Sequence, residues 1–270
     1  MRNSCFYFKQ FAIAQDKCAM KVGTDGILLG AWAKLPENAQ ILDIGTGTGL
    51  LALMLAQRSQ SSNTFPNGMS FEVRMGGALR RPSLPLEHYP FFSNTFIDAV
   101  EIDHDAYQQA KENIESSPWR DRINIHHARI QDWAIACSQQ YDLIISNPPF
   151  FENAFKPSQN SRTLARHSDS LSQTDLLQIA TQLLKPNGHL AVIYPTDLAN
   201  NFLAKAQSFN LFCDRQVQVK PTPQSPVKRI LLELSPTQYA AQTTMLTIEE
   251  SKHLYTQDYI ALVKDFYLNL

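Results

Sequence analysis

The chain has 270 residues, enough for one α/β domain with additions or for two small domains. Hydrophobic residues make up 44% of it, which is enough for a substantial core, and 24 basic and 25 acidic residues give a net charge of -1. This balance excludes the strongly basic composition of many nucleic-acid-binding proteins, so any contact with RNA must rely on local basic groups.

Targeting and metal-binding signals are also missing from the sequence. The N-terminus lacks the apolar core of a signal peptide, and no apolar run reaches membrane-spanning length. Neither the cysteines nor the neighbouring histidines have the spacing of metal ligands; the residues considered are Cys5, Cys18, Cys137, Cys213, His126, His127 and His167. We therefore expect a cytoplasmic protein with reduced thiols, no metal and no membrane partner, and we expect it to be a monomer.

Strands and helices are predicted to alternate along the chain. Apolar runs bounded by turn residues indicate strands at Ile41–Ile44, Phe96–Ile102, Ile123–His127, Leu143–Ser146 and Leu190–Tyr194. Helical periodicity indicates helices at Leu50–Gln57, Asp105–Ser116, Gln173–Leu184 and Leu198–Ser208. A closing antiparallel pair is expected at Leu211–Val219 and Arg229–Leu234. This order predicts an α/β fold with a doubly wound, mostly parallel, seven-stranded sheet that has a terminal antiparallel strand and binds ligands at its carboxyl ends.

One segment breaks the alternation. Ser59–Thr95 contains four prolines and several glycines and has no sustained helical or strand period. A structureless segment of this length is unusual inside a compact unit, so we interpret it as a surface insertion between the first helix and the second strand. Arg74, Arg80 and Arg81 within it are candidate RNA contacts; the simpler alternative is a loop without a role.

A glycine-rich loop follows the first of these strands, in Asp43-Ile44-Gly45-Thr46-Gly47-Thr48-Gly49. Glycines let the backbone come close to a ligand, and the N-terminus of the next helix suits a carboxylate. A dehydrogenase loop would need a glycine where this chain has Leu50. The spacing instead resembles the loop of S-adenosylmethionine-dependent methyltransferases, and the candidate cofactor contacts are Asp43, Gly45, Gly47 and Gly49.

Acidic residues follow the next two strands. Glu101 ends the second strand, where a carboxylate is expected to bind ribose hydroxyls. It lies 56 residues after Gly45 instead of about 20, and removing the proposed insertion restores the spacing. Asp132, after the third strand, is a candidate acceptor for the cofactor's adenine amine; alternatively it is the N-cap of a short helix.

The turn Asn147-Pro148-Pro149-Phe150 follows the fourth strand. The Asn147 oxygen and the Pro148 carbonyl are suited to accept the two N–H groups of an exocyclic amine, which leaves its lone pair free, and proline adds no competing donor. Phe150 offers a ring on which a base can stack, and the turn must then align the amine with the methyl group. Asn147 is also a candidate cofactor contact. The alternative is a rigid turn without chemistry.

Together these motifs resemble the bacterial tRNA1(Val) (adenine(37)-N6)-methyltransferase family, class I S-adenosylmethionine-dependent enzymes with a Rossmann-like fold. The resemblance extends over most of the chain outside the insertion, which family members generally lack, and is carried by Phe6–Phe11, Cys18–Trp32, Ile144–Pro149, Lys228–Leu232 and Tyr255–Tyr267. It implies methyl transfer from S-adenosyl-L-methionine to N6 of the unpaired adenine at position 37, in the anticodon loop of a valine tRNA.

Two flanking segments complete the prediction. Residues 1–38 are expected to form an extension that covers the cofactor pocket of a methyltransferase domain at 39–270, with Lys21 and Thr24 as candidate cofactor contacts. The alternative for Val22–Trp32 is an amphipathic helix on the sheet edge. After the turn, a basic cluster is placed to contact RNA phosphates, or is a solvated charged loop; its members are Lys156, Arg162, Arg166 and His167.

Other targets and a non-enzymatic role remain open at this point. The turn also fits guanine N2 of ribosomal RNA, glutamine N5 of a protein, and adenine N6 of DNA. Glutamine-modifying relatives carry a larger helical N-terminal domain, and DNA enzymes usually carry a target-recognition domain. A non-enzymatic RNA-binding module on the same scaffold is a third possibility, which the intact motifs disfavour.

Overall fold

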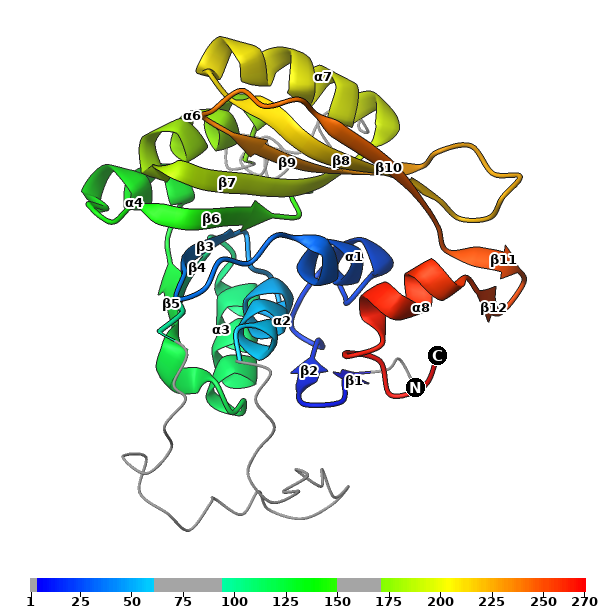
Figure 1. Ribbon diagram of the computed structural model, residues 1–270. Coiled ribbons are helices and arrows are strands. Elements are labelled where there is room, and N and C mark those ends of the chain that lie inside the picture. The colour runs from blue at the N-terminus through cyan, green and yellow to red at the C-terminus, as the bar shows by residue number, and fades with distance from the viewer. Residues whose placement is uncertain (1–3, 61–93, 150–170) are drawn as a thin grey trace, which may run out of the picture.

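The computed structural model describes residues 4–60, 94–149 and 171–270. Within these residues, a central sheet of eight strands has the order β10–β8–β9–β7–β6–β3–β4–β5, with helices on both faces (Figure 1). The strands are β3 (Gln40–Ile44), β4 (Phe96–Glu101), β5 (Ile123–His127), β6 (Tyr141–Ser146), β7 (Leu184–Pro195), β8 (Phe212–Lys220), β9 (Arg229–Ser235) and β10 (Gln242–Thr247).

The sheet confirms the predicted α/β fold but differs in two details. It has eight strands in place of seven, because β10 pairs in parallel with β8 at the sheet edge. Four of the six residues of β10 are exposed, so this strand lacks the apolar run that marks the others. The antiparallel strand is β9, which lies inside the sheet between β7 and β8 and pairs in antiparallel fashion with both.

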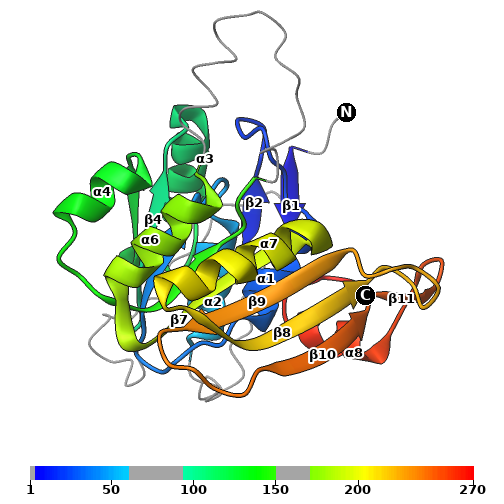
Figure 2. The same cartoon turned by 90° about the horizontal axis from the view of Figure 1, so that it is seen from above.

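Helices cover the two faces of the sheet and enclose two hydrophobic clusters. On one face lie α1 (Thr24–Trp32), α2 (Leu50–Arg58), α3 (His104–Glu115) and α8 (Gln257–Val263). On the other lie α4 (Ile130–Ala136), α6 (Gln173–Leu183) and α7 (Thr196–Ala206), and Figure 2 shows α6 and α7 from above. The four predicted helices are confirmed to within two residues at each end.

The strand β7 begins earlier than predicted. Its register jumps between the Tyr141–Leu184 and Leu143–His189 pairs, so the intervening residues of β7 form an irregularity within the strand. Gly188 is needed there, because a Cβ atom would lie 2.6 Å from the Tyr141 carbonyl oxygen. The helix α6 ends at Leu183, and the chain enters β7 at once at Leu184.

The alternative for Val22–Trp32, a helix, is present as α1, but this helix is buried instead of amphipathic. Its residues from Gly26 to Ala31 are all buried. A Cβ atom on Gly26 would lie 2.9 Å from the Leu50 side chain, and one on Gly30 would lie 2.7 Å from the Met54 sulfur. The two glycines therefore allow α1 to pack closely on α2.

The hairpin near the start of the described residues lies beside the C-terminal residues that follow α8 (Figure 1). The strands β1 (Cys5–Tyr7) and β2 (Ala12–Ala14) form a hairpin. In the loop between them, the Lys9 N–H donates to the Phe266 carbonyl at 2.8 Å. Phe8 and Tyr267 form an isolated antiparallel bridge. A second hairpin, of β11 (Glu249–Ser251) and β12 (Leu254–Tyr255), precedes α8. The N-terminal residues share one hydrophobic cluster with α2 and α8, and the division at residue 38 stays a prediction.

The proposed insertion is attached at the amino ends of the strands. The Asn94 N–H donates to the Asn38 side-chain oxygen at 3.2 Å, and the Ala39 N–H donates to the buried Thr95 hydroxyl at 3.2 Å. These anchors lie at the sheet edge opposite the loops that follow the strands. Arg74, Arg80 and Arg81 lie outside the described residues.

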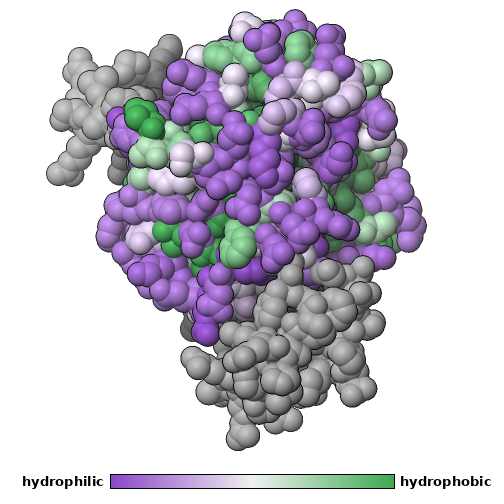
Figure 3. All heavy atoms as spheres, turned by 60° about the vertical axis from the view of Figure 1, so that its left-hand side comes forward, coloured by the Kyte–Doolittle hydropathy of each residue, from purple (hydrophilic) through white to green (hydrophobic). Residues whose placement is uncertain are grey.

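The surface offers no large hydrophobic area in the view of Figure 3, which is mostly hydrophilic with small groups of hydrophobic side chains. None of the helices in the described part of the chain has both the length and the apolar character needed to cross a bilayer. The four cysteines are free thiols.

Candidate active site

The structure brings the glycine loop and the Asn-Pro-Pro turn to the same edge of the sheet. β3 and β6 are parallel neighbours, with Asp43 opposite Ile145, so the segments that follow them leave the sheet side by side. The Ser146 hydroxyl donates to the Ile44 carbonyl at 2.8 Å and ties the two strand ends together. This is the edge at which doubly wound sheets bind their ligands.

All three loop glycines have left-handed backbone conformations. The φ angles are +70° at Gly45, +58° at Gly47 and +82° at Gly49, values that other residues rarely adopt. A Cβ atom on Gly45 or Gly47 would meet nothing within 4 Å, so the loop backbone faces open space there. The glycines are thus required by conformation, and the open side leaves room for a ligand.

Glu101 joins this loop to the end of β4. It is 8% exposed, and its two carboxylate oxygens accept from the Gly47 N–H at 2.8 Å and the Asp103 N–H at 2.9 Å. Asp103 in turn caps α3 by accepting from the Ala106 N–H at 2.9 Å. Each Glu101 oxygen retains a second lone pair, as a contact to ribose hydroxyls would need. That contact stays a prediction.

Asp43 is fully buried beneath the loop. One of its oxygens accepts from the Thr46 hydroxyl at 2.6 Å and the Ala52 N–H at 3.2 Å, while the other has no hydrogen-bond partner. Burial raises the pKa of this carboxyl to about 7; the charge of Glu101 adds to the rise, and the two hydrogen bonds oppose it. The unpaired oxygen is closed off from the surface, so a direct contact of Asp43 with the cofactor stays a prediction.

A buried asparagine that sequence analysis missed holds the other side of the loop. The Asn113 side-chain nitrogen donates to the Thr48 and Ala14 carbonyls, and its oxygen accepts from the Ala14 N–H, each at 2.9 Å. Gln109, one helical turn earlier, accepts from the Lys17 N–H at 3.0 Å. The available signal was a pair of amides on the face of α3 that the helical period assigns to the core.

The N-terminus of α1 lies beside the Asn-Pro-Pro turn. A Cβ atom on Gly26 would be 3.8 Å from the Asn147 side-chain nitrogen, and the neighbouring Asp25 forms an ion pair with Arg229 at 2.8 Å. Thr24 is the first residue of the helix, and both Thr24 and Lys21 are exposed. The structure therefore places the N-terminal segment at the predicted edge, and the cofactor contacts of Lys21 and Thr24 stay predictions.

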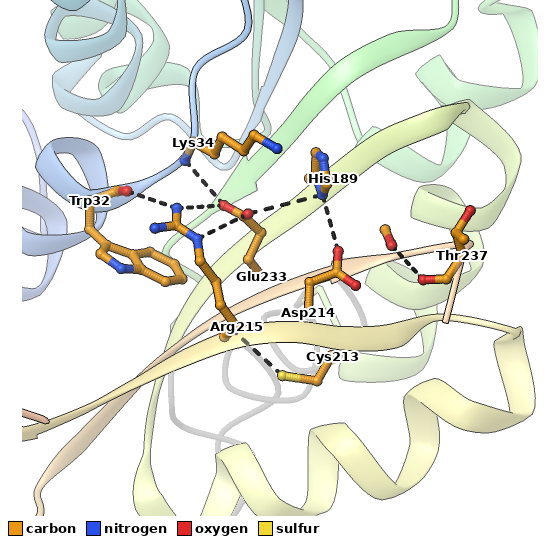
Figure 4. A network of polar contacts seen from close by, with 9 residues as sticks. Trp32, Lys34, His189, Cys213, Asp214, Arg215, Glu233 and Thr237 are labelled. Atoms are coloured by element: carbon orange, nitrogen blue, oxygen red, sulfur yellow. Dashed lines mark hydrogen bonds and ion pairs between the residues drawn. The ribbon is translucent and has the colours of Figure 1, made fainter. Parts of the chain in front are cut away.

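The C-terminus of α1 is held by a polar network at the other edge of the sheet (Figure 4). Arg215 donates to the Trp32 carbonyl at 3.0 Å and to both oxygens of the buried Glu233 at 2.8 and 3.1 Å. Glu233 also accepts from the Lys34 N–H at 3.1 Å. Burial opposes ionisation of Glu233, but Arg215 outweighs it and holds the pKa of this carboxyl below its usual range. These contacts fix α1 in place.

A cavity of about 470 Å³ lies beside this network, lined in part by His189 and Asp214. Because these residues lie near the amino ends of β7 and β8, the cavity is separate from the glycine loop. The His189 ring nitrogen lies 3.2 Å from an Asp214 oxygen. No hydrogen bond joins His189 to the backbone of the glycine loop. The cavity therefore has no part in the predicted cofactor site.

The Asn-Pro-Pro turn carries an unused acceptor. The Asn147 side-chain oxygen is buried and has no hydrogen-bond partner among residues 4–60, 94–149 and 171–270. Pro148 is buried and Pro149 is exposed, while Phe150 lies outside the described residues. A free acceptor at this position is what binding of an amine requires. The predicted RNA contacts also lie outside the described residues: Lys156, Arg162, Arg166 and His167.

The remaining predicted residues lie near the ends of β4 and β5. Asp132 is the third residue of α4, its side chain is 70% exposed and 4.0 Å from Arg129, and the N-cap is Arg129, so the capping alternative is wrong. Its contact with the cofactor stays a prediction. His126 lies 2.9 Å from Asp98, and the described residues contain no group of three or more His, Cys, Asp or Glu side chains that could hold a metal ion.

Comparison with known proteins places these features in a family. The profile described as Eco57I restriction-modification methylase matches residues 13–219. Among solved structures, a predicted O-methyltransferase from Agrobacterium tumefaciens covers 90% of this chain and 96% of its own, with a TM-score of 0.58 and 15% identity. A type I restriction-modification methyltransferase subunit from Streptococcus thermophilus covers 96% of this chain and 53% of its own, with a TM-score of 0.56 and 14% identity. These two structures show the fold.

Curated relatives are more similar. The tRNA1(Val) (adenine(37)-N6)-methyltransferase of Trichodesmium erythraeum is 50% identical over 268 residues, which cover 99% of this chain and 99% of its own. The enzyme of the same name from Pectobacterium carotovorum is 42% identical over 268 residues, which cover 99% of this chain and 95% of its own. Similarity of this extent shows that the chain belongs to the tRNA1(Val) (adenine(37)-N6)-methyltransferase family.

Proposed function

We propose that this protein transfers a methyl group from S-adenosyl-L-methionine to N6 of adenine 37 in tRNA1(Val). The observation that carries the proposal is the position of Asn147, with its free acceptor oxygen, beside the open-faced glycine loop. Full-length relatives at 40–50% identity bear this activity in their names, which supports the choice of substrate.

The cofactor would be held by the loop after β3 and its neighbours. Gly45 and Gly47 present backbone to the ligand, Glu101 is placed for the ribose, and Asp43 lies below the loop for the amino group. The N-terminus of α2 suits the ligand's carboxylate. When bound, S-adenosyl-L-methionine supplies an electrophilic methyl group on a positively charged sulfur.

The turn after β6 would prepare the amine. The lone pair of an adenine N6 is delocalised into the ring, so the amine is a weak nucleophile. The Asn147 oxygen and the Pro148 carbonyl accept its two N–H groups and favour a geometry in which the lone pair is available. The turn would thereby hold the nitrogen with its lone pair directed at the methyl group that bound S-adenosyl-L-methionine would supply; the amine would exchange one proton for that methyl group and release the proton to solvent. The main contribution of the protein is orientation.

An anticodon-loop adenine suits this arrangement. It is already unpaired, so moving it into the pocket costs little unstacking energy. Specific recognition of RNA commonly uses such loops. Guanine N2, glutamine N5 and DNA adenine N6 fit the turn chemically, but the family favours the tRNA adenine. We also infer that the protein works in the cytoplasm, where tRNA is modified, and the monomeric state stays a prediction.

The test is incubation of the protein with methyl-labelled S-adenosyl-L-methionine and bulk tRNA, ribosomal RNA or DNA, followed by nucleoside mass spectrometry. We expect label as N6-methyladenosine in one valine tRNA. Label in ribosomal guanine or in DNA would move the target to one of those alternatives, and label in protein, sought by peptide mass spectrometry after incubation with a cell extract, would move it to glutamine. Binding of the cofactor without any transfer would favour the non-enzymatic module.

A further inference from the structure

The loop between β8 and β9, residues 221–228, lies at the same sheet edge as the candidate active site. β8 runs parallel to β7 and β6 because both β7 and β8 are antiparallel to β9. The carboxyl end of β8 at Lys220 therefore lies on the edge that carries Asn147. Three strand steps separate β8 from β6, which corresponds to about 14 Å at the usual spacing.

A chain of contacts connects this loop to the turn. Arg229, directly after the loop, forms an ion pair at 2.8 Å with Asp25 at the start of α1. The next residue of α1, Gly26, borders Asn147. The loop is thus placed where the backbone of a nucleic acid would continue on either side of a base bound at the turn.

The loop is built as a rigid donor surface. Its sequence, Pro221-Thr-Pro-Gln-Ser-Pro-Val-Lys228, contains three prolines, two hydroxyls and an amide but no acidic residue. The Thr222 and Ser225 hydroxyls lie 2.8 Å apart, and the Lys228 N–H donates to the Val219 carbonyl at 2.9 Å. A preformed loop loses little conformational entropy when it binds.

A lysine stands at each end of the loop: Lys220 directly precedes it, and Lys228 is its last residue. Lys228 is exposed, and the Lys220 ammonium donates to the Pro223 carbonyl at 3.5 Å. Within the ranges that the structure describes, neither ammonium group forms an ion pair with a carboxylate. The chain as a whole has a net charge of -1, and Glu249, whose N–H donates to the Pro221 carbonyl at 2.9 Å, also borders the loop; the two lysine ammonium groups outnumber this carboxylate and leave a local excess of positive charge.

We infer that the β8–β9 loop, with Lys220 and Lys228, binds phosphates of the RNA backbone next to the target adenine. The inference rests on the proposed function, because RNA is the anion that it supplies. Phosphate contacts by lysines and hydroxyls fix the register of a nucleic acid without reading its sequence. The loop would therefore position the anticodon arm, while the turn after β6 selects the base.

The test is the affinity of the Lys220→Gln/Lys228→Gln double variant for a valine tRNA transcript, measured by filter binding from 50 to 200 mM salt. The matched control is Lys111→Gln/Lys205→Gln, which removes the same charge from α3 and from the last turn of α7. We expect the loop variant to bind about tenfold more weakly at low salt, with a salt slope shallower by about 0.7 for each lost contact. Its affinity for S-adenosyl-L-methionine should be unchanged.

The outcomes separate this inference from the proposed function. Wild-type affinity and slope in the loop variant, or equal losses in the control, would overturn the inference while methylation of tRNA by the wild type stands. A weaker affinity with an unchanged salt slope would also overturn it, because shape and not charge would then be responsible. Failure of the wild type to methylate tRNA would instead refute the proposed function.

Discussion

The two halves of the candidate site are held in place by different means. The glycine loop after β3 is fixed by buried side chains from other elements, namely Glu101 and Asn113, and by Asp43 beneath it. The turn after β6 is fixed by its own prolines and by the Ser146 hydroxyl, and the acceptor oxygen of Asn147 stays unused. Changes near the loop should therefore disturb both stability and cofactor binding, whereas changes in the turn should mainly disturb the chemistry.

The largest effect that this comparison predicts is on the rate of Asn147→Ala. Loss of the amide oxygen removes one acceptor for the target amine, and removal of one preorganised polar contact at a reacting group typically costs about 10²–10³-fold in kcat. Calorimetric affinity for S-adenosyl-L-methionine should change much less, since the glycine loop is intact. Near-normal turnover in single-turnover assays would show that the turn has no role in activating the amine.

Glu101→Ala should act mainly on the cofactor. It removes the acceptor for the Gly47 and Asp103 N–H groups as well as the predicted ribose contact. Hydrogen bonds to charged groups are worth about 1.5–3 kcal/mol each, so we expect S-adenosyl-L-methionine to bind about 10–100-fold more weakly. Titration calorimetry measures this directly. Glu112→Ala on the exposed side of α3 is the control, and equal affinities in the two variants would remove Glu101 from the site.

Asn113→Leu tests whether the loop is held from behind. The change leaves the Thr48 and Ala14 carbonyls and the Ala14 N–H without their partner, which should lower the free energy of unfolding by about 2–3 kcal/mol. The KM for the cofactor should rise severalfold with a smaller change in kcat. Urea denaturation and steady-state kinetics check the two parts. A loss of stability with an unchanged KM would mean that Asn113 supports the fold only.

A final prediction concerns the pH dependence of stability through Asp43. In the unfolded chain this carboxyl ionises near pH 3.9, whereas in the folded protein its pKa is about 7. Between these two pH values, Asp43 is protonated in the folded protein but ionised in the unfolded chain. Its contribution to the free energy of unfolding is therefore complete below about pH 4 and is lost as the pH rises through 7. Asp43→Asn should remove this decline relative to wild type in urea titrations from pH 5 to 8. The exposed Asp121→Asn serves as control, and parallel curves for all three proteins would contradict the prediction.

Much of the fold follows from patterns that are local in the sequence. Ile123–His127 was predicted with the bounds that β5 has, because turn residues border a short apolar alternation. β10 was missed because its residues are mostly exposed and polar, so its pairing with β8 depends on the available sheet edge. The irregularity at the start of β7 was not predicted for a similar reason: Gly188 is required because a carbonyl of the neighbouring strand β6 lies too close for a side chain.

The site divides in the same way. The glycines and Asn147 could be identified because each belongs to a short motif of consecutive residues with a characteristic chemistry. The bracing by Asn113 and the Asp25–Arg229 ion pair could not, because they join positions about 65 and 204 residues apart. In a helix, Asn113 resembles any other polar residue until its three partners are known. Side-chain contacts across the sheet edge are therefore the part that needs a structure.

The pairing of the chain ends has a consequence for synthesis. In the loop of the first hairpin, the Lys9 N–H donates a hydrogen bond to the Phe266 carbonyl, and Phe8 forms a β-bridge with Tyr267. On a ribosome that makes about 5–20 residues per second, the hairpin must wait until Phe266 and Tyr267 have been made before these contacts can form. The sheet and the glycine loop can assemble earlier. Because the Ala14 N–H of β2 also donates to Asn113, docking of the N-terminal hairpin on α3 becomes one of the last steps in the folding of the newly made protein.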